Sequence, residues 1–343
     1  MRKWNWTSGV LCAAALTVGV FAALFAGRYA IAVPDVLNAL AAPLLPERTP
    51  AGNVMNVVWN IRLPRIFLAL LSGAGLALAG VAFQSVFANP LATPDTLGVA
   101  NGASFGAALA ILLGMHTAGI QAFALLGGIA AVMLALSISR IRGTSTVFMM
   151  ILAGMVVSSF FQALVSLVKY VADPQDVLPS ITYWLMGSMK TVTRRTLLLG
   201  APLIVTGSVL IILLRWKLNV MSLPEEEARA LGVRVKEIRF LMILSASMVT
   251  AAVVSMCGQI GWVGLLIPHI SRLLFGNDNR SVVPASMFFG AGFMLLMDTI
   301  ARTAIAAEIP VSILTAVCGA PVFILLLRRT ALQSTAGGDG YAF

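Results

Sequence analysis

Residues 64–87 read PRIFLALLSGAGLALAGVAFQSVF, and this stretch decides the fold class of the chain. It contains one charged residue, Arg65, at its start. A helix needs roughly 20 mostly apolar residues to cross the hydrocarbon core of a bilayer. The small residues between Leu71 and Gly80 include Gly75 and Ala79, which are four positions apart, a spacing that lets helices approach closely in lipid. The stretch therefore predicts a membrane-spanning helix inside a tightly packed bundle.

The composition of the whole chain also indicates an integral membrane protein. Hydrophobic residues make up 59% of the 343 residues and charged residues only 10%, whereas a soluble domain averages roughly 25% charged residues. The net charge of +10 would fit nucleic-acid binding, but no basic run with interleaved aromatic residues supports that interpretation. An excess of cations on the inner side and contact with anionic lipids explain the charge better.

Apolar stretches along the chain predict about ten spans, which form a single all-α transmembrane domain over residues 1–343. Nine or eleven spans are the alternatives, because the eighth stretch is short and only a brief turn separates the third from the fourth. The first begins like a signal peptide, but its apolar run is longer than the usual ~7–15 residues, so we expect it to remain as a helix. The predicted spans are 8–27, 64–87, 97–114, 118–139, 146–169, 196–215, 240–258, 261–275, 284–301 and 310–328.

The positions of lysine and arginine predict that the N-terminus, with Arg2 and Lys3, lies on the inner side. With ten spans, both termini then face the cytoplasm. This orientation leaves several arginines on the outer side. Among them are Arg62, Arg65 and Arg302.

The sequence offers little for catalysis or cofactor binding. It has no G-x-x-x-x-G-K-[ST] phosphate loop, and its three cysteines form no C-x-x-C or Cys/His cluster. His269 is better interpreted as a structural histidine that bonds to backbone near a proline than as a haem or metal ligand. Asp298 and Arg302 are spaced to pair on one helix face. Scarce ionisable residues within the spans argue against a carrier driven by ion gradients, and no nucleophile–base arrangement supports a membrane enzyme.

Charge is concentrated in one segment, LPEEEARALGVRVKEIRF, residues 223–240. Ser222 and Glu225 fit a capping box, acids in the first turn suit a helix N-terminus, and Gly232 fits a C-cap. We predict a helix of about nine residues that is too short and too polar to span and that lies on the inner surface. Ala228 and Leu231 would give this helix a small apolar face, which favours a docking element over an ordinary solvated loop.

Several stretches, in this order along the chain, resemble the permease subunits of type II ABC importers, the FecCD family. Ser312 stands where that family commonly has glycine, and because serine is small we expect the local packing to survive. The stretches are IRLPR (61–65), SGAGLALAGVAFQSVFANPLATPDTLGVANGA (72–103), EARALGV (227–233), GWVGLLIPHISRLLFG (261–276) and DTIARTAIAAEIPVSILTAVCGAPVFILLL (298–327).

The resemblance implies a permease subunit that moves a ferric siderophore or a similar iron chelate across the cytoplasmic (inner) membrane, with haem or cobalamin as alternative cargoes. It implies a second permease subunit, identical or paralogous, two ATPase subunits on the inner side, an extracytoplasmic substrate-binding protein on the outer side and contact with membrane lipid. ATP and Mg²⁺ would be bound by the ATPase. No cofactor is expected in this chain, which would not itself be an enzyme.

The resemblance also implies roles for individual residues. The arginines Arg62, Arg65 and Arg302 would meet carboxylates of the binding protein through charge-assisted hydrogen bonds. The pathway would be lined mostly by residues 146–169 and 310–327. The segment 222–240 would couple the permease to the ATPase, through Glu225, Glu226, Glu227, Ala228, Arg229, Ala230, Leu231, Gly232 and Val233.

Overall fold

The computed structural model describes residues 4–50, 52–140 and 146–336, and every regular element in them is helical. Seven helices are long and apolar enough to cross a membrane, and three shorter apolar helices complete the ten that the sequence predicts. The seven are α1 (Trp6–Phe25), the continuous helix Val54–Val86 that contains α4 (Leu63–Val86), α6 (Thr117–Ser139), α7 (Val147–Val171), α9 (Arg194–Leu213), α12 (Val235–Cys257) and α14 (Asn279–Ala304). The three are α5 (Val99–Leu112), α13 (Val263–Phe275) and the apolar part, Val311–Leu326, of α15 (Val311–Ala336).

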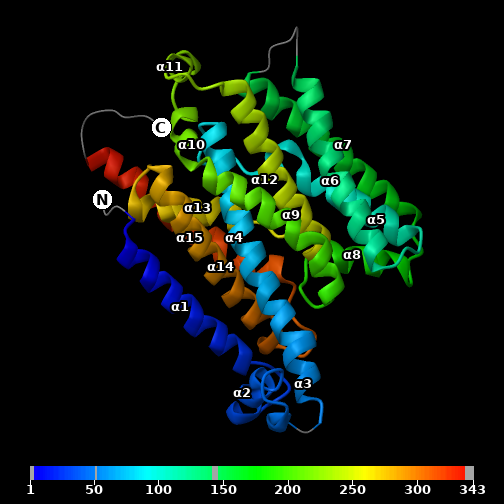
Figure 1. Ribbon diagram of the computed structural model, residues 1–343. Coiled ribbons are helices and arrows are strands. Elements are labelled where there is room, and N and C mark those ends of the chain that lie inside the picture. The colour runs from blue at the N-terminus through cyan, green and yellow to red at the C-terminus, as the bar shows by residue number, and fades with distance from the viewer. Residues whose placement is uncertain (1–3, 51, 141–145, 337–343) are drawn as a thin grey trace.

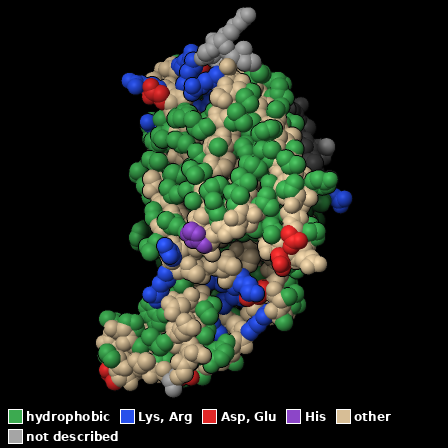
Figure 2. All heavy atoms as spheres, turned by 90° about the vertical axis from the view of Figure 1, so that its right-hand side faces the viewer, with side chains coloured by type: hydrophobic (Ala, Val, Ile, Leu, Met, Phe, Trp, Pro, Cys, Tyr) green, Lys and Arg blue, Asp and Glu red, His purple; other side chains and the backbone are tan. Residues whose placement is uncertain are grey.

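The remaining elements are short. Two of them, over residues 54–62, begin the continuous helix Val54–Val86, and the others connect the long helices. At one end of the bundle, called here the α2 end, lies α2 (Figure 1); at the other, the α11 end, lies α11. Figure 2 shows hydrophobic side chains over the middle of one face and charged side chains toward both ends, as expected for a protein that is surrounded by lipid. The short elements are α2 (Val33–Ala41), η1 (Pro46–Arg48), α3 (Val54–Asn56), the π-helix η2 (Val57–Arg62), η3 (Pro94–Leu97), α8 (Val177–Leu185), α10 (Arg215–Met221) and α11 (Glu225–Ala230).

Helix α4 is the centre of the bundle. All of its residues from 75 to 86 are buried, and it packs against α9, α12, α13 and α14. Its glycines make this possible. A methyl group added at Gly73 would collide with the carbonyl group of Gly290 in α14, and one added at Gly80 would collide with that of Gly264 in α13. The close packing predicted from the small residues of this stretch is therefore confirmed, with backbones in direct contact.

Helices α5, α6 and α7 follow the same rule. Gly102 of α5 lies against Gly127 of α6, with no room for a side chain between them. Gly154 of α7 lies against the carbonyl group of Thr96 in η3. The chain therefore holds its helices together by close backbone approach, because in lipid there is little hydrophobic force to drive one helix against another.

The α4–α14 contact yields a direct test. Gly73→Ala should destabilise the folded protein by about 1–3 kcal/mol, because α4 and α14 must separate to admit the methyl group. Gly292→Ala is the matched control in α14, since a methyl group there would meet only Leu16 Cδ1 at 3.8 Å. The measurement is thermal unfolding of both variants in detergent. Equal midpoints for the two variants would contradict the account.

Candidate functional site

The charged segment forms α11, a six-residue helix that projects from its end of the bundle (Figure 1). The predicted capping box is wrong: Pro224 occupies the N-cap position, and the Ser222 hydroxyl donates to the Leu218 carbonyl, which closes α10 instead. The predicted C-cap at Gly232 is confirmed, with a left-handed φ of 75°. The helix is shorter than predicted because it begins after Pro224 and ends before Gly232.

The C-terminal end of α11 forms a Schellman motif. The N–H of Gly232 donates to the Arg229 carbonyl and that of Val233 to the Ala228 carbonyl, at 2.9 and 3.2 Å. The prediction that Ala228 and Leu231 share an apolar face is wrong. Ala228 is buried against the bundle, whereas Leu231 is 64% exposed. The motif therefore fixes Leu231 as an apolar residue that faces outward.

Glu225 fastens α11 to the bundle. One carboxylate oxygen accepts a hydrogen bond from Arg229 at 2.5 Å, the predicted i, i+4 pair, and the other accepts from Arg239 of α12 at 3.4 Å. Burial would raise the pKa of Glu225, but the hydrogen bond from Arg229 and the charge of Arg239 outweigh burial and hold this pKa below its ordinary value. The carboxylate is therefore ionised at neutral pH. Other side chains of the segment, those of Glu226, Glu227 and Ala230, are exposed.

Ion pairs join α4, α14 and the loop before α15 near the α2 end. Arg65 Nε donates to Asp298 at 2.7 Å, and Arg65 Nη1 donates to Glu308 at 2.9 Å. Arg302 Nε lies 3.8 Å from the second oxygen of Asp298, so the predicted pairing of these two residues is confirmed. The Asp298 side chain is 0% exposed. Loss of one partner from such a cluster would leave a buried charge uncompensated, so the cluster has a structural role.

Two arginines also hold the end of α1. The last carbonyl groups of a helix lack partners within the helix, and cations are favourable beside them. Arg62 donates to two carbonyl oxygens in this region, and Arg302 donates to two others. The acceptors are Leu24 at 2.5 Å and Tyr29 at 2.6 Å for Arg62, and Ala26 at 2.9 Å and Ala23 for Arg302.

The three arginines predicted to dock a partner, Arg62, Arg65 and Arg302, are thus buried and hydrogen-bonded inside the chain. Their docking role stays a prediction, and a partner's carboxylates would first have to displace these bonds. Other basic side chains in the loops and helix ends of this region are exposed, and Figure 2 shows lysine and arginine gathered below the apolar middle of the molecule. The exposed ones are Arg28, Arg48, Lys190, Arg194 and Arg195.

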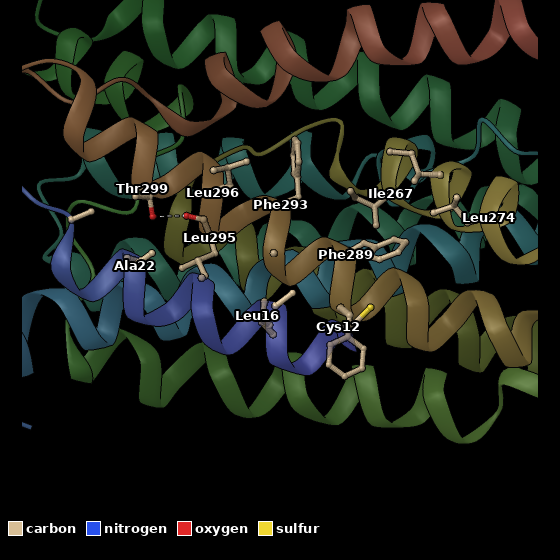
Figure 3. Close-up of a pocket in the computed structure, with 17 residues that line it drawn as sticks. Cys12, Leu16, Ala22, Ile267, Leu274, Phe289, Phe293, Leu295, Leu296 and Thr299 are labelled. Atoms are coloured by element: carbon tan, nitrogen blue, oxygen red, sulfur yellow. Dashed lines mark hydrogen bonds between the residues drawn. The ribbon is translucent and has the colours of Figure 1, made fainter. Parts of the chain in front are cut away.

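One cavity of the structure is apolar. It measures about 680 Å³ and lies between α1, α13 and α14 (Figure 3). Its polar side chains are few: Cys12 and Thr299, and the Thr299 hydroxyl is already bonded to the Leu295 carbonyl at 2.7 Å. This cavity offers apolar contact and no free polar group that could recognise a charged or polar ligand.

The second cavity, about 370 Å³, lies where the helices of the bundle are interrupted. It is bordered by η3, by the loop 258–262 between α12 and α13, and by the start of α15. Gly264, at the start of α13, contacts the Leu76 carbonyl, which lies about 20 Å along α4 at 1.5 Å per residue. The interruption is therefore deep within the bundle. Non-helical backbone at membrane depth is found where it is covered by protein or lines a cavity.

This second cavity, called here the central pocket, has a mixed lining. Its polar side chains come from four different parts of the chain: Thr93 and Asp95 from η3 and its N-cap, Thr250 from α12, Gln259 and Trp262 from the loop, and Ser312 from α15. Sequence reasoning missed all of these except Ser312. The Gly- and Pro-rich interruptions of the apolar pattern were the available signal.

Two residues that line the central pocket have an unusual backbone conformation or a hydrogen bond to another segment of the chain. Trp262 has a left-handed φ of 71°, which is uncommon for a bulky residue and concentrates at functional sites. The Ser312 hydroxyl donates to the Met186 carbonyl, so the serine that departs from the family pattern bonds α15 to the chain after α8. That serine in place of glycine preserves the local packing stays a prediction.

In the part of the chain that the structure describes, no group of three or more His, Cys, Asp and Glu side chains lies close enough to hold a metal ion. The His269 ring packs edge-on to Phe323 with ring centres 5.5 Å apart. Its Nε2 atom has no hydrogen-bond partner among the described residues, so the bond to backbone that we expected is not made by this atom.

Comparisons with known proteins place these features in one family. A molybdate import system permease of Haemophilus influenzae is 42% identical over 316 residues, which cover 92% of this chain and 93% of the relative. A cobalamin import system permease of Halobacterium salinarum is 37% identical and covers 88% of this chain and 80% of its own length. A solved structure, described as an inward-facing conformation of an ABC transporter assigned provisionally to the metal-chelate type, is 39% identical with a TM-score of 0.86 and covers 95% of this chain and 100% of its own.

The model of the FecCD transport family matches residues 15–329. This range includes α11, the ion pairs of the α2 end and the central pocket. The chain therefore belongs to the FecCD transport family.

Proposed function

We propose that this chain is the permease subunit of an ABC importer that carries a ferric siderophore or a similar metal chelate across the cytoplasmic membrane. The family comprises multi-pass membrane transport subunits, and membership implies ATPase partners and a second permease. The finer parts of the proposal are the cargo, the orientation and the surfaces that meet each partner.

The observation that carries the proposal is α11. It is a capped helix fastened by Glu225 to Arg239 at the end of a bundle that has no phosphate-binding loop in its sequence. It presents Leu231 to solvent among charged neighbours. An exposed apolar residue with a polar rim is the arrangement of a small docking surface. We assign the α11 end to the cytoplasm and α11 to a cleft of the ATPase. The terminal residues 1–3 and 337–343, which we also expect in the cytoplasm, lie outside the described residues.

The central pocket is proposed as half of the translocation pathway. It lies deep in the bundle, and it is lined by α15, one of the two helices that the family resemblance assigns to the pathway. The described residues leave one side of α15 uncovered, since Val317 and Leu325 are 65% and 60% exposed. A second permease subunit packed there would close the pathway between two central pockets. We expect lipid chains to cover the apolar cavity beside α1.

The α2 end is proposed to face outward and to bind the substrate-binding protein. In this arrangement Arg62, Arg65 and Arg302 keep the docking surface rigid. The exposed cations Arg194 and Arg195, at the start of α9, are free to meet a partner's carboxylates, apart from one bond of 3.3 Å from Arg194 to the Trp59 carbonyl.

Replacement of Leu231 tests the ATPase contact. Leu231→Asp should leave the permease folded, because the side chain is exposed, and should lower the amount of ATPase that co-purifies by about tenfold, because it puts a charge into an apolar contact. Leu44→Asp is the matched control: Leu44 is 86% exposed and lies just beyond α2. Full retention of the ATPase by Leu231→Asp would rule out this contact.

Charge reversal tests the outer surface. The double variant Arg194→Glu/Arg195→Glu should weaken binding of the importer's binding protein about tenfold at low salt, and the difference should shrink at high salt, because exposed charge pairs are screened. The control carries Lys236→Glu and Arg280→Glu, two exposed cations near the α11 end. The measurement is a titration of the binding protein onto the permease in detergent. An unchanged affinity at low salt would remove these arginines from the interface.

A further inference from the structure

We propose that Asp95 is a charge-selecting residue of the pathway, which favours cationic or neutral metal chelates and disfavours oxyanions such as molybdate. The inference rests on the proposed function, because it takes the central pocket as part of the pathway. It goes further by naming a residue of the pocket and the class of cargo that this residue admits.

Asp95 lies at membrane depth. It belongs to η3, which packs against α7: the Thr96 carbonyl contacts Gly154, and Gly98 contacts Ser158. Gly154 is seven residues beyond Val147, the start of α7, which corresponds to about 10 Å along the helix. Placing an ionisable side chain at such depth costs free energy, and residues of this kind commonly mark substrate pathways.

Among the described residues, the Asp95 carboxylate has no counter-charge. It takes part in none of the ion pairs among the described residues, and no Lys, Arg or His lines the central pocket. Its polar neighbour is the backbone N–H of Ala100 in the first turn of α5. Asp298, the acid in α14, is by contrast buried between Arg65 and Arg302. Asp95 is an exposed residue, and it lines the central pocket.

A second polar group of the same pocket, the Thr250 hydroxyl, makes no hydrogen bond within the described part of the chain. Thr250 is only 3% exposed, and its hydroxyl makes no hydrogen bond with any described residue. Both side chains line the central pocket, together with Gln259 and the strained Trp262. A buried hydroxyl without a partner is unfavourable unless something occupies the space beside it. The central pocket therefore combines a negative charge with a buried hydroxyl that no described residue bonds.

The sign of the charge sets the class of cargo. A carboxylate in a partly dehydrated pocket acts on nearby ions more strongly than it would in water, and a second permease copy would add a second Asp95 to the same pathway. A molybdate dianion would be repelled, whereas a cationic or neutral chelate would pass or be attracted.

The local field can be measured without knowing the cargo. Ala316 lines the same pocket and is small, so Ala316→Cys provides a reporter thiol once Cys12, Cys257 and Cys318 have been replaced by alanine. The rates of reaction with two thiosulfonate reagents are compared, one carrying a trimethylammonium group and the other a sulfonate. Asp95→Asn should lower the ratio of the cationic to the anionic rate about tenfold. The asparagine oxygen can still accept a hydrogen bond at the start of α5, so the fold is kept.

The control is Leu44→Cys near the α2 end, where Asp95→Asn should leave the ratio unchanged. An unchanged ratio at residue 316, or a thiol there that neither reagent reaches, would overturn the proposal. ATP-driven uptake of molybdate by the unaltered importer would overturn the cargo class. The rate ratio requires no ATPase, so a failure of ATPase binding would defeat the proposed function and leave this result standing.

Discussion

Direct contact between the backbones of α4 and its neighbours is the constraint on which the rest of this structure depends. Gly73 meets Gly290 of α14, and Gly80 meets Gly264 of α13. Because Gly264 is the second residue of α13, its contact with α4 forces α13 to begin deep inside the bundle. The chain from Gly258 to Trp262 is then left non-helical at that depth, and the central pocket forms beside it. Glycines chosen for helix packing therefore also create the polar interruption that a transport pathway needs.

The two ends of the bundle differ in how they use charge. At the α2 end, buried arginines pair with Asp298 and Glu308 and donate to the last carbonyl groups of α1, which makes that end rigid. At the α11 end, Glu225 uses its charge to fasten one short helix, and most other charges of the segment face solvent. A rigid surface suits a partner that delivers cargo, and a fastened, projecting helix suits a partner that transmits force. The cargo would pass between them through a pocket that contains a single acid.

The spans could be predicted well because the length of an apolar stretch decides whether a helix can cross a membrane, and this length can be counted directly in the sequence. The C-cap of α11 could be predicted because only glycine adopts the required φ readily. The predicted N-cap at Ser222 is wrong because the Ser222 hydroxyl donates to the Leu218 carbonyl. The sequence pattern does not determine whether this hydroxyl bonds to the helix before it or caps the helix after it. The burial of Arg62 could not be predicted, because it depends on the end of α1, which is far from Arg62 in sequence. The central pocket could not be predicted either, because η3 and α15, which border it, are far apart in sequence.

The central claim is that a separate ATPase acts on this chain through α11. The most direct test is a photo-crosslink from Leu231→Cys, labelled with a benzophenone maleimide in a cysteine-free background and assembled with the ATPase in lipid nanodiscs. The account predicts a covalent product with the ATPase from residue 231 and none from the same label at Leu44→Cys. A label at residue 231 that captures only lipid or permease would contradict it.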